Sequence, residues 1–83
     1  MKNIVYILLS IKHPKSYVGI TSNIAERLIQ RNKGCNYYSR KYKPWRVVYT
    51  EKCKSETEAL NRERYLKSHA GRDFIKKLLQ KIQ

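Results

Sequence analysis

The chain has 83 residues, of which 41% are hydrophobic and 30% charged, and its 19 lysines and arginines against 6 acidic residues give a formal net charge of +13. This length leaves room for one small hydrophobic core and excludes a large multidomain enzyme. The apolar run over residues 4–9 is far too short to span a membrane and lacks the cleavage site of a signal peptide. We therefore expect one domain over residues 1–83 and a cytoplasmic protein.

The excess of positive charge favours a polyanionic partner, and nucleic acid is the leading class. The alternative is that the charge serves only solubility. No helical pattern combines a broad apolar face with a wholly basic one, which argues against a membrane partner. Cys35 and Cys53 are far apart and separated from the two histidines, so we expect reduced thiols and no zinc site.

Three segments carry the pattern of β-strands. Residues 4–9 and 17–20 are rich in β-branched and aromatic side chains and flank a turn-forming stretch, which predicts an antiparallel hairpin. Residues 46–50 predict a third strand. Residues 35–43 show neither a helical nor a strand period, and this pattern indicates a basic, aromatic loop that ends at Pro44.

Three helices complete the expected fold. Asn23 and Ser55 each precede a glutamate by three residues, which is the spacing of a capping box, so they begin the first two helices. Gly34 and Gly71 are expected to end these helices. The apolar residues of the three helices are Ile24, Ala25, Leu28 and Ile29; Ala59, Leu60 and Leu66; and Phe74, Ile75, Leu78, Leu79 and Ile82. The order β-β-α-β-α-α predicts an α+β fold, with a small three-stranded antiparallel sheet flanked by helices.

Glu63 is unusual because it falls within the apolar stripe of the second helix, between Ala59 and Leu66. A carboxylate directed toward a core needs a cation or hydrogen-bond donors to offset its desolvation. Two interpretations remain open at this stage. Glu63 either pairs with an arginine or lysine of a neighbouring helix, or it binds a hard divalent cation together with phosphate and water.

Two further pairs of residues are candidates for function. Arg27 and Arg31 stand one turn apart on the first helix, where they could grip phosphate oxygens or form an ordinary solvated face. Tyr6 and Tyr17 lie on paired strands, and strand tyrosines are most often packing residues. Gly19 removes a side chain at a place where another group could approach the sheet.

Together these residues resemble the GIY-YIG nuclease family, and most closely its small single-domain bacterial proteins. Residues 4–6 (Ile-Val-Tyr) resemble the first signature triplet and residues 17–19 (Tyr-Val-Gly) the second. Arg27 stands where the family has its helix arginine, and Glu63 matches the metal-binding glutamate. The resemblance covers nearly the whole chain.

The resemblance implies a metal-dependent endonuclease that hydrolyses phosphodiester bonds of DNA. In that family role Tyr17 is the general base, Tyr6 supports it by hydrogen bonding, and Arg27 stabilises charge on the phosphoryl group. Glu63 would hold one divalent cation, Mg²⁺ or Mn²⁺, at the leaving group. Arg31 departs from the family pattern, which usually has histidine or tyrosine there, and arginine can contribute only charge and donors.

The basic, aromatic segment beside the site is expected to supply the remaining nucleic-acid contacts. Its members are Tyr37, Tyr38, Arg40, Lys41 and Lys43, together with Arg31 on the first helix. The chain has no room for a targeting domain, which predicts structure-directed rather than sequence-specific cleavage, or a targeting protein as partner. The choice between DNA and RNA stays open. Two rival interpretations are a non-catalytic nucleic-acid-binding module and a nuclease subunit that depends on such a partner.

Overall fold

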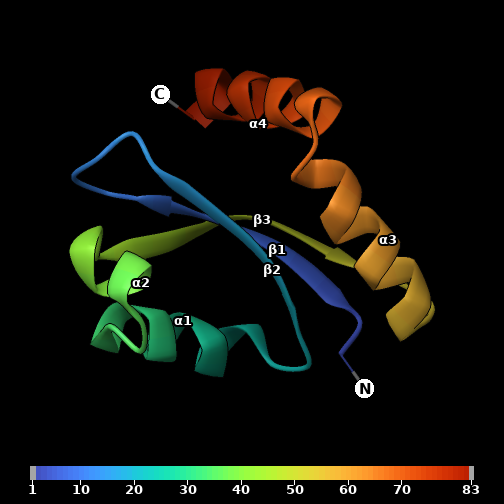
Figure 1. Cartoon of the computed structure of the whole chain (residues 1–83), viewed down its shortest axis with the longest axis horizontal. Helices are drawn as coiled ribbons and strands as arrows, with labels where there is room; N and C mark the ends of the chain where they lie inside the picture. Colours follow the sequence, from blue (N-terminus) through green and yellow to red (C-terminus); the bar gives the residue numbers. More distant parts are fainter. Residues whose placement is uncertain (1, 83) are drawn as a thin grey trace.

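A computed structural model of the chain describes residues 2–82, and the expected apolar side chains of Leu79 and Ile82 lie outside the described part. Three strands form one antiparallel sheet in the order β2-β1-β3 (Figure 1). The strands are β1 (Ile4–Ser10), β2 (Ser16–Thr21) and β3 (Trp45–Lys52). The helices are α1 (Ile24–Lys33), α2 (Tyr37–Lys41), α3 (Glu56–Leu66) and α4 (His69–Ile82). The expected α+β class and antiparallel sheet are confirmed.

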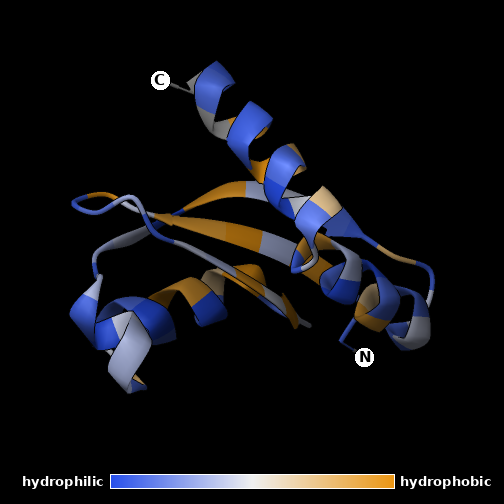
Figure 2. Ribbon diagram, turned by 45° about the horizontal axis from the view of Figure 1, so that its top comes forward, coloured by the Kyte–Doolittle hydropathy of each residue, from blue (hydrophilic) through white to orange (hydrophobic). Residues whose placement is uncertain are grey.

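The central strand β1 is buried from both sides, which explains its continuous apolar sequence. Alternate side chains of a strand point to opposite faces of a sheet. Val5 and Ile7 pack with Leu66 and Ile75 on the face covered by α3 and α4. The opposite face carries Tyr6, Leu8 and Trp45, and α1 packs against it through Ile24 and Leu28. Figure 2 shows hydrophobic strands between helices whose outer surfaces are hydrophilic.

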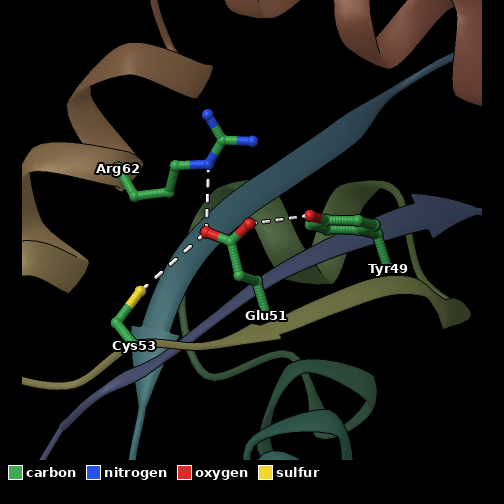
Figure 3. Close-up of polar contacts among 4 residues, drawn as sticks. All are labelled: Tyr49, Glu51, Cys53 and Arg62. Carbon is green, nitrogen blue, oxygen red and sulfur yellow. Dashed lines mark hydrogen bonds and ion pairs between the residues drawn. The ribbon is translucent and has the colours of Figure 1, made fainter.

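A cluster of polar contacts fastens α3 to β3 (Figure 3). Glu51 accepts hydrogen bonds from the Tyr49 hydroxyl at 2.9 Å and from Arg62 Nε at 3.0 Å. The Arg62 guanidinium also lies over the Phe74 ring of α4, 5.7 Å from its centroid. These contacts hold α3 against the sheet, and the next residue of that helix is Glu63.

The expected loop over residues 35–43 is wrong, because the segment contains the short helix α2. Its cap is a reciprocal pair in which the Ser39 backbone N–H donates to Asn36 Oδ1 at 2.8 Å and the Asn36 N–H donates to Ser39 Oγ at 3.2 Å. The Trp45 indole then donates to the Ser39 carbonyl at 3.0 Å. A helix of five residues is too short to show a period. The order is therefore β-β-α-α-β-α-α.

Gly71 does not end the second helix as expected, since α3 stops at Leu66 and Gly71 lies inside α4. A Cβ at this position would overlap the backbone of Leu66 and Tyr65, so the glycine permits α4 to approach the end of α3. The caps at Asn23 and Ser55 and the left-handed Gly34 are confirmed. Among the helices between residues 2 and 82, none has the length and apolar character needed to cross a membrane.

Three residues assigned to apolar stripes are on the surface instead. Ala25 and Ile29 on α1 and Leu60 on α3 are exposed. In each case the apolar residue lies at the margin of the stripe that packs on the sheet. The buried surface of a helix in this small molecule is thus narrower than its apolar pattern, and scattered exposed apolar residues are ordinary.

Replacing Gly71 with alanine should destabilise the fold by about 1–3 kcal/mol, because the new methyl group has no space beside Leu66. Urea unfolding followed by circular dichroism measures the effect. Lys77→Ala, at an exposed position of the same helix, is the control and should change stability by about 0.5 kcal/mol or less. Equal stability of the two variants would contradict the close helix approach.

Candidate active site

Two stacked tyrosines occupy the sheet face that α1 covers. Leu8 is paired with Tyr17 and Tyr6 with Gly19, so the two phenols share one face of neighbouring strands. Their ring centroids are 6.4 Å apart and their planes differ by only 5°. Tyr6 is fully buried, whereas Tyr17 is partly exposed.

Gly19 makes this arrangement possible. A Cβ at position 19 would lie 2.5 Å from Tyr6 Oη and 2.7 Å from Cζ. The group that approaches the sheet at this glycine is thus the Tyr6 phenol of the adjacent strand. The glycine serves close packing here, because its backbone adopts an ordinary strand conformation.

The Tyr6 hydroxyl is buried, and within the described residues it has no hydrogen-bond partner. Its burial raises the pKa of Tyr6 above the ordinary value, and the positive charges of Arg31 and Arg27 offset part of this effect. Tyr6 is therefore neutral near pH 7. A buried hydroxyl without a partner is costly, and such a group in a folded protein calls for an explanation such as a functional role.

Arg31 occupies an unexpected position. It is only 7% exposed, and its guanidinium carbon lies 4.3 Å from the centroid of the Tyr17 ring. Its Nη1 donates to Cys35 Sγ at 3.1 Å, and its Nε has no partner among residues 2–82. This burial rules out the solvated-face interpretation of Arg31, and its role in binding nucleic acid stays a prediction. The arginine instead places a fixed positive charge against the two phenols.

A groove of about 410 Å³ opens along β2, at an edge of the sheet. Tyr17 and Tyr38 form one side of the groove, and Lys67 and Arg72 form the other. The Tyr38 hydroxyl donates to the Ser16 carbonyl at 2.9 Å, and its ring centroid is 6.0 Å from that of Tyr17. The groove therefore joins the phenol pair to two basic side chains from α4 and the end of α3.

Glu63 approaches this region from α3. Its side chain is 22% exposed and pairs with Lys67, whose Nζ is 3.5 Å from Glu63 Oε2 and whose side chain is 58% exposed. The partner is therefore a lysine one turn along the same helix rather than a residue of a neighbouring helix. Such exposed pairs are weak, so this one leaves the carboxylate available to a stronger cation.

The donor set fits a magnesium-type ion only as a single-carboxylate site. Residues 2–82 contain no group of three or more histidine, cysteine, aspartate or glutamate side chains that could enclose a metal. Mg²⁺ often binds through one or two carboxylates and completes its shell with waters and substrate phosphates. Glu63, which is partly exposed and is paired with the exposed side chain of a lysine, is compatible with that mode.

Some of the predicted site residues lie in one cluster, and the others lie beside it. Tyr6, Tyr17 and Arg31 are in one cluster, and Arg27 is near enough for its charge to lower the pKa of Tyr6. Arg27 itself lines a small hollow at the end of β2. Glu63 is connected to the groove through its ion-pair partner rather than by contact with the tyrosines.

Of the basic, aromatic segment over residues 35–43, one predicted contact residue lines the groove and the others do not. Tyr38 lines the groove, whereas Tyr37 is 70% exposed and Lys41 Nζ lies 5.7 Å from the Tyr37 ring centroid. Within residues 2–82, four members of the segment are absent from the groove lining and lie on or just after α2: Tyr37, Arg40, Lys41 and Lys43.

Two basic residues of the groove were missed in the sequence. Lys67 could have been found, because it follows Glu63 by one helical turn and so shares its face. Arg72 had no comparable signal. Its position depends on the crossing of α4 over the end of α3, which only the folded chain defines.

The buried Tyr6 predicts a loss of stability at alkaline pH. Its pKa is raised in the folded state, so its stability contribution is complete below the unfolded pKa of about 10 and falls as pH rises above it. Urea unfolding of the wild type and Tyr6→Phe at pH 8 and at pH 10.5 should show a smaller alkaline loss for the variant. Tyr37→Phe controls for removal of a hydroxyl, and parallel curves for wild type and Tyr6→Phe would contradict the assignment.

Gly19→Ala should displace the Tyr6 ring, since the added methyl group would meet its hydroxyl. The aromatic proton resonances of Tyr6 and Tyr17 should both shift in NMR spectra, because the rings are stacked. Val18→Ala, which alters the opposite face of β2, is the control and should leave these resonances nearly unchanged. Unaltered tyrosine resonances in Gly19→Ala would rule out the close contact.

Comparison with known proteins points to one family. Residues 2–78 match the family described as the GIY-YIG catalytic domain. A UPF0213 protein of Clostridium perfringens is 39% identical over 66 residues, which cover 78% of this chain and 70% of that protein. A UPF0213 protein of Desulfotalea psychrophila is 43% identical over 54 residues, 61% of this chain, and the match spans about half of that protein, 48%. No solved structure gave a significant match. The chain belongs to the GIY-YIG family.

Proposed function

We propose that this chain is a metal-dependent endonuclease that hydrolyses phosphodiester bonds of DNA and selects its substrate by structure rather than sequence. Membership of the GIY-YIG family implies nuclease activity. The observation that carries the proposal is the stacked phenol pair beneath Arg31, one member of which opens into a basic groove. A reactive side chain beside a positively charged groove suits a polyanionic substrate.

Hydrolysis of a phosphodiester requires an acceptor for the proton of the attacking water. Tyr17 is our candidate, because it is the phenol that reaches the groove while Tyr6 is buried behind it. The Arg31 guanidinium lies over its ring, with its carbon 4.3 Å from the ring centroid, and so places a positive charge beside this phenol. We assign Tyr6, held neutral by burial, the role of a hydrogen-bond donor, because its hydroxyl has no partner among residues 2–82.

The phosphoryl group gains negative charge as water attacks, and a cation must stabilise it. Arg27 is the candidate, since α1 places it close to the buried Tyr6 hydroxyl. Arg27 lies outside the groove lining, whereas Lys67 and Arg72 line the groove itself and can hold neighbouring phosphates. Tyr38 offers a ring on which an unpaired base can stack.

Nucleases of this family generally use divalent metal ions, and Glu63 is the residue that would hold Mg²⁺ or Mn²⁺ in this chain. When bound, the ion would stabilise negative charge on the departing 3′ oxygen, so that the products carry 5′-phosphate and 3′-hydroxyl ends. Glu63 must first leave Lys67, whose exposed side chain can turn to a phosphate instead.

Purified protein should cut branched, nicked, single-stranded or duplex DNA in the presence of Mg²⁺ or Mn²⁺ and should not cut in EDTA. Tyr17→Phe and Glu63→Gln should each lower the cleavage rate by about 100-fold or more. Tyr65→Phe and Glu56→Gln, on the exposed side of α3, are matched controls and should retain activity. Full activity in Tyr17→Phe or Glu63→Gln would refute the assigned site.

The buried Arg31 favours one alternative, a nucleic-acid-binding module without turnover, because an arginine cannot exchange protons near neutral pH. Such a module binds DNA in a salt-sensitive way, and its binding survives Glu63→Gln. Retained binding with no metal-dependent product from any of these DNAs would establish this alternative.

A further inference from the structure

A second hollow, of about 600 Å³, lies at the turn between β1 and β2. Its basic residues are Lys12, Lys15 and Arg46, with His13 beside them. Its lining includes no carboxylate among the residues that the structure describes. A concave surface with three permanent positive charges and no opposing charge is suited to phosphate groups.

Hydrogen bonds hold this turn in place against the segment before β3. Ser10 Oγ donates to the Tyr42 carbonyl at 2.6 Å and accepts the His13 N–H at 3.1 Å. The Ile11 N–H donates to the Pro44 carbonyl at 3.0 Å. The backbone that carries Lys12 and Lys15 is thus tied to the chain that leads into Arg46.

The aromatic side chains nearby add to this support. The Lys15 ammonium lies 5.5 Å from the centroid of the Tyr42 ring, and the His13 ring packs edge-on against the same tyrosine at 5.3 Å. Tyr42 in turn contacts Tyr38, whose ring lines the groove of the candidate active site. The turn and the groove therefore share one aromatic support.

The two hollows meet at Ser16, which lines both of them. From the groove to the turn the permanent positive charges are Lys67, Arg72, Lys15, Lys12 and Arg46. Among the described residues no carboxylate lines either hollow, although Glu63 pairs with Lys67 at the groove end of this row. This distribution gives one strip of positive charge that begins beside Tyr17 and ends at the hairpin.

We propose that the β1–β2 turn is a second phosphate-binding site, which holds the backbone of the same DNA strand several nucleotides away from the scissile bond. The inference rests on the proposed function, because it assumes that the groove receives DNA. It adds the path of the DNA strand beyond the groove. The strand passes Ser16 and lies across the turn. Lys12, Lys15 and Arg46 bind its phosphates without reading base sequence.

The test is the salt dependence of binding, measured by fluorescence anisotropy with a labelled single-stranded 20-nucleotide DNA in EDTA, so that no cleavage occurs. The triple variant Lys12→Gln, Lys15→Gln, Arg46→Gln should bind at least tenfold more weakly at low salt. Three lost contacts to a single strand should reduce the slope of log K against log salt by about 2. Circular dichroism and thermal unfolding confirm that the variant is folded.

The control removes the same amount of charge from the opposite end of the sheet, as Lys2→Gln, Lys52→Gln, Lys54→Gln, all of which are exposed positions. It should keep nearly the slope of the wild type. If both triple variants lose the same slope, net charge alone accounts for binding and the turn is no site. A hairpin variant that binds like the wild type overturns the inference equally.

Failure of the endonuclease proposal gives a different result. If the salt slope falls in the hairpin variant but the wild type cuts no DNA in the presence of metal, the second site is supported and the enzyme is refuted. If the wild type cuts DNA in a way that depends on Tyr17 and Glu63, but the hairpin variant keeps the salt slope of the wild type, the enzyme is supported and the second site is refuted. No binding to DNA at any salt concentration would overturn both.

Discussion

The arrangement of the site depends on one contact, the Tyr6 phenol seated against Gly19 of the neighbouring strand. It requires the β1–β2 register in which Tyr17 stands opposite Leu8, because a shift by one residue would turn every side chain of β2 to the other face. The register in turn brings the two phenols into a stack and gives Arg31 a ring to cover. A small core is thus also the support of the reactive groups.

On the opposite face of the sheet, packing and an ion pair hold α3, the helix that carries Glu63. The ion pair of Glu51 with Arg62 attaches α3 to β3, while Ala59 and Leu66 bury the apolar side of the helix. Glu63 follows Arg62 directly and pairs with Lys67 one helical turn further along. In a chain with only 6 acidic residues, two glutamates on this side each have a cationic partner.

Much of this architecture could be predicted from local signals. The strands follow from β-branched and aromatic runs, and three of the helix ends follow from Asn23, Ser55 and Gly34, because caps act within a few residues. The helix α2 and the place of Gly71 could not be predicted, since one is shorter than a period and the other depends on a crossing between helices. The burial of Arg31 could not be predicted either, because a basic residue in the last turn of a helix usually lies on the surface. The face shared by the two tyrosines was predictable, whereas the Arg72 side of the groove was not.

The open side of β2 has a consequence for the behaviour of the protein in concentrated solution. β2 is an outer strand of the sheet, and an outer strand can recruit a second molecule through its unpaired backbone groups. Here the Tyr38 hydroxyl takes the Ser16 carbonyl, and Lys67 and Arg72 stand along the same margin. Two copies that met margin to margin would bring like charges together. The residues that attract a polyanion therefore also protect the monomer from strand-mediated aggregation.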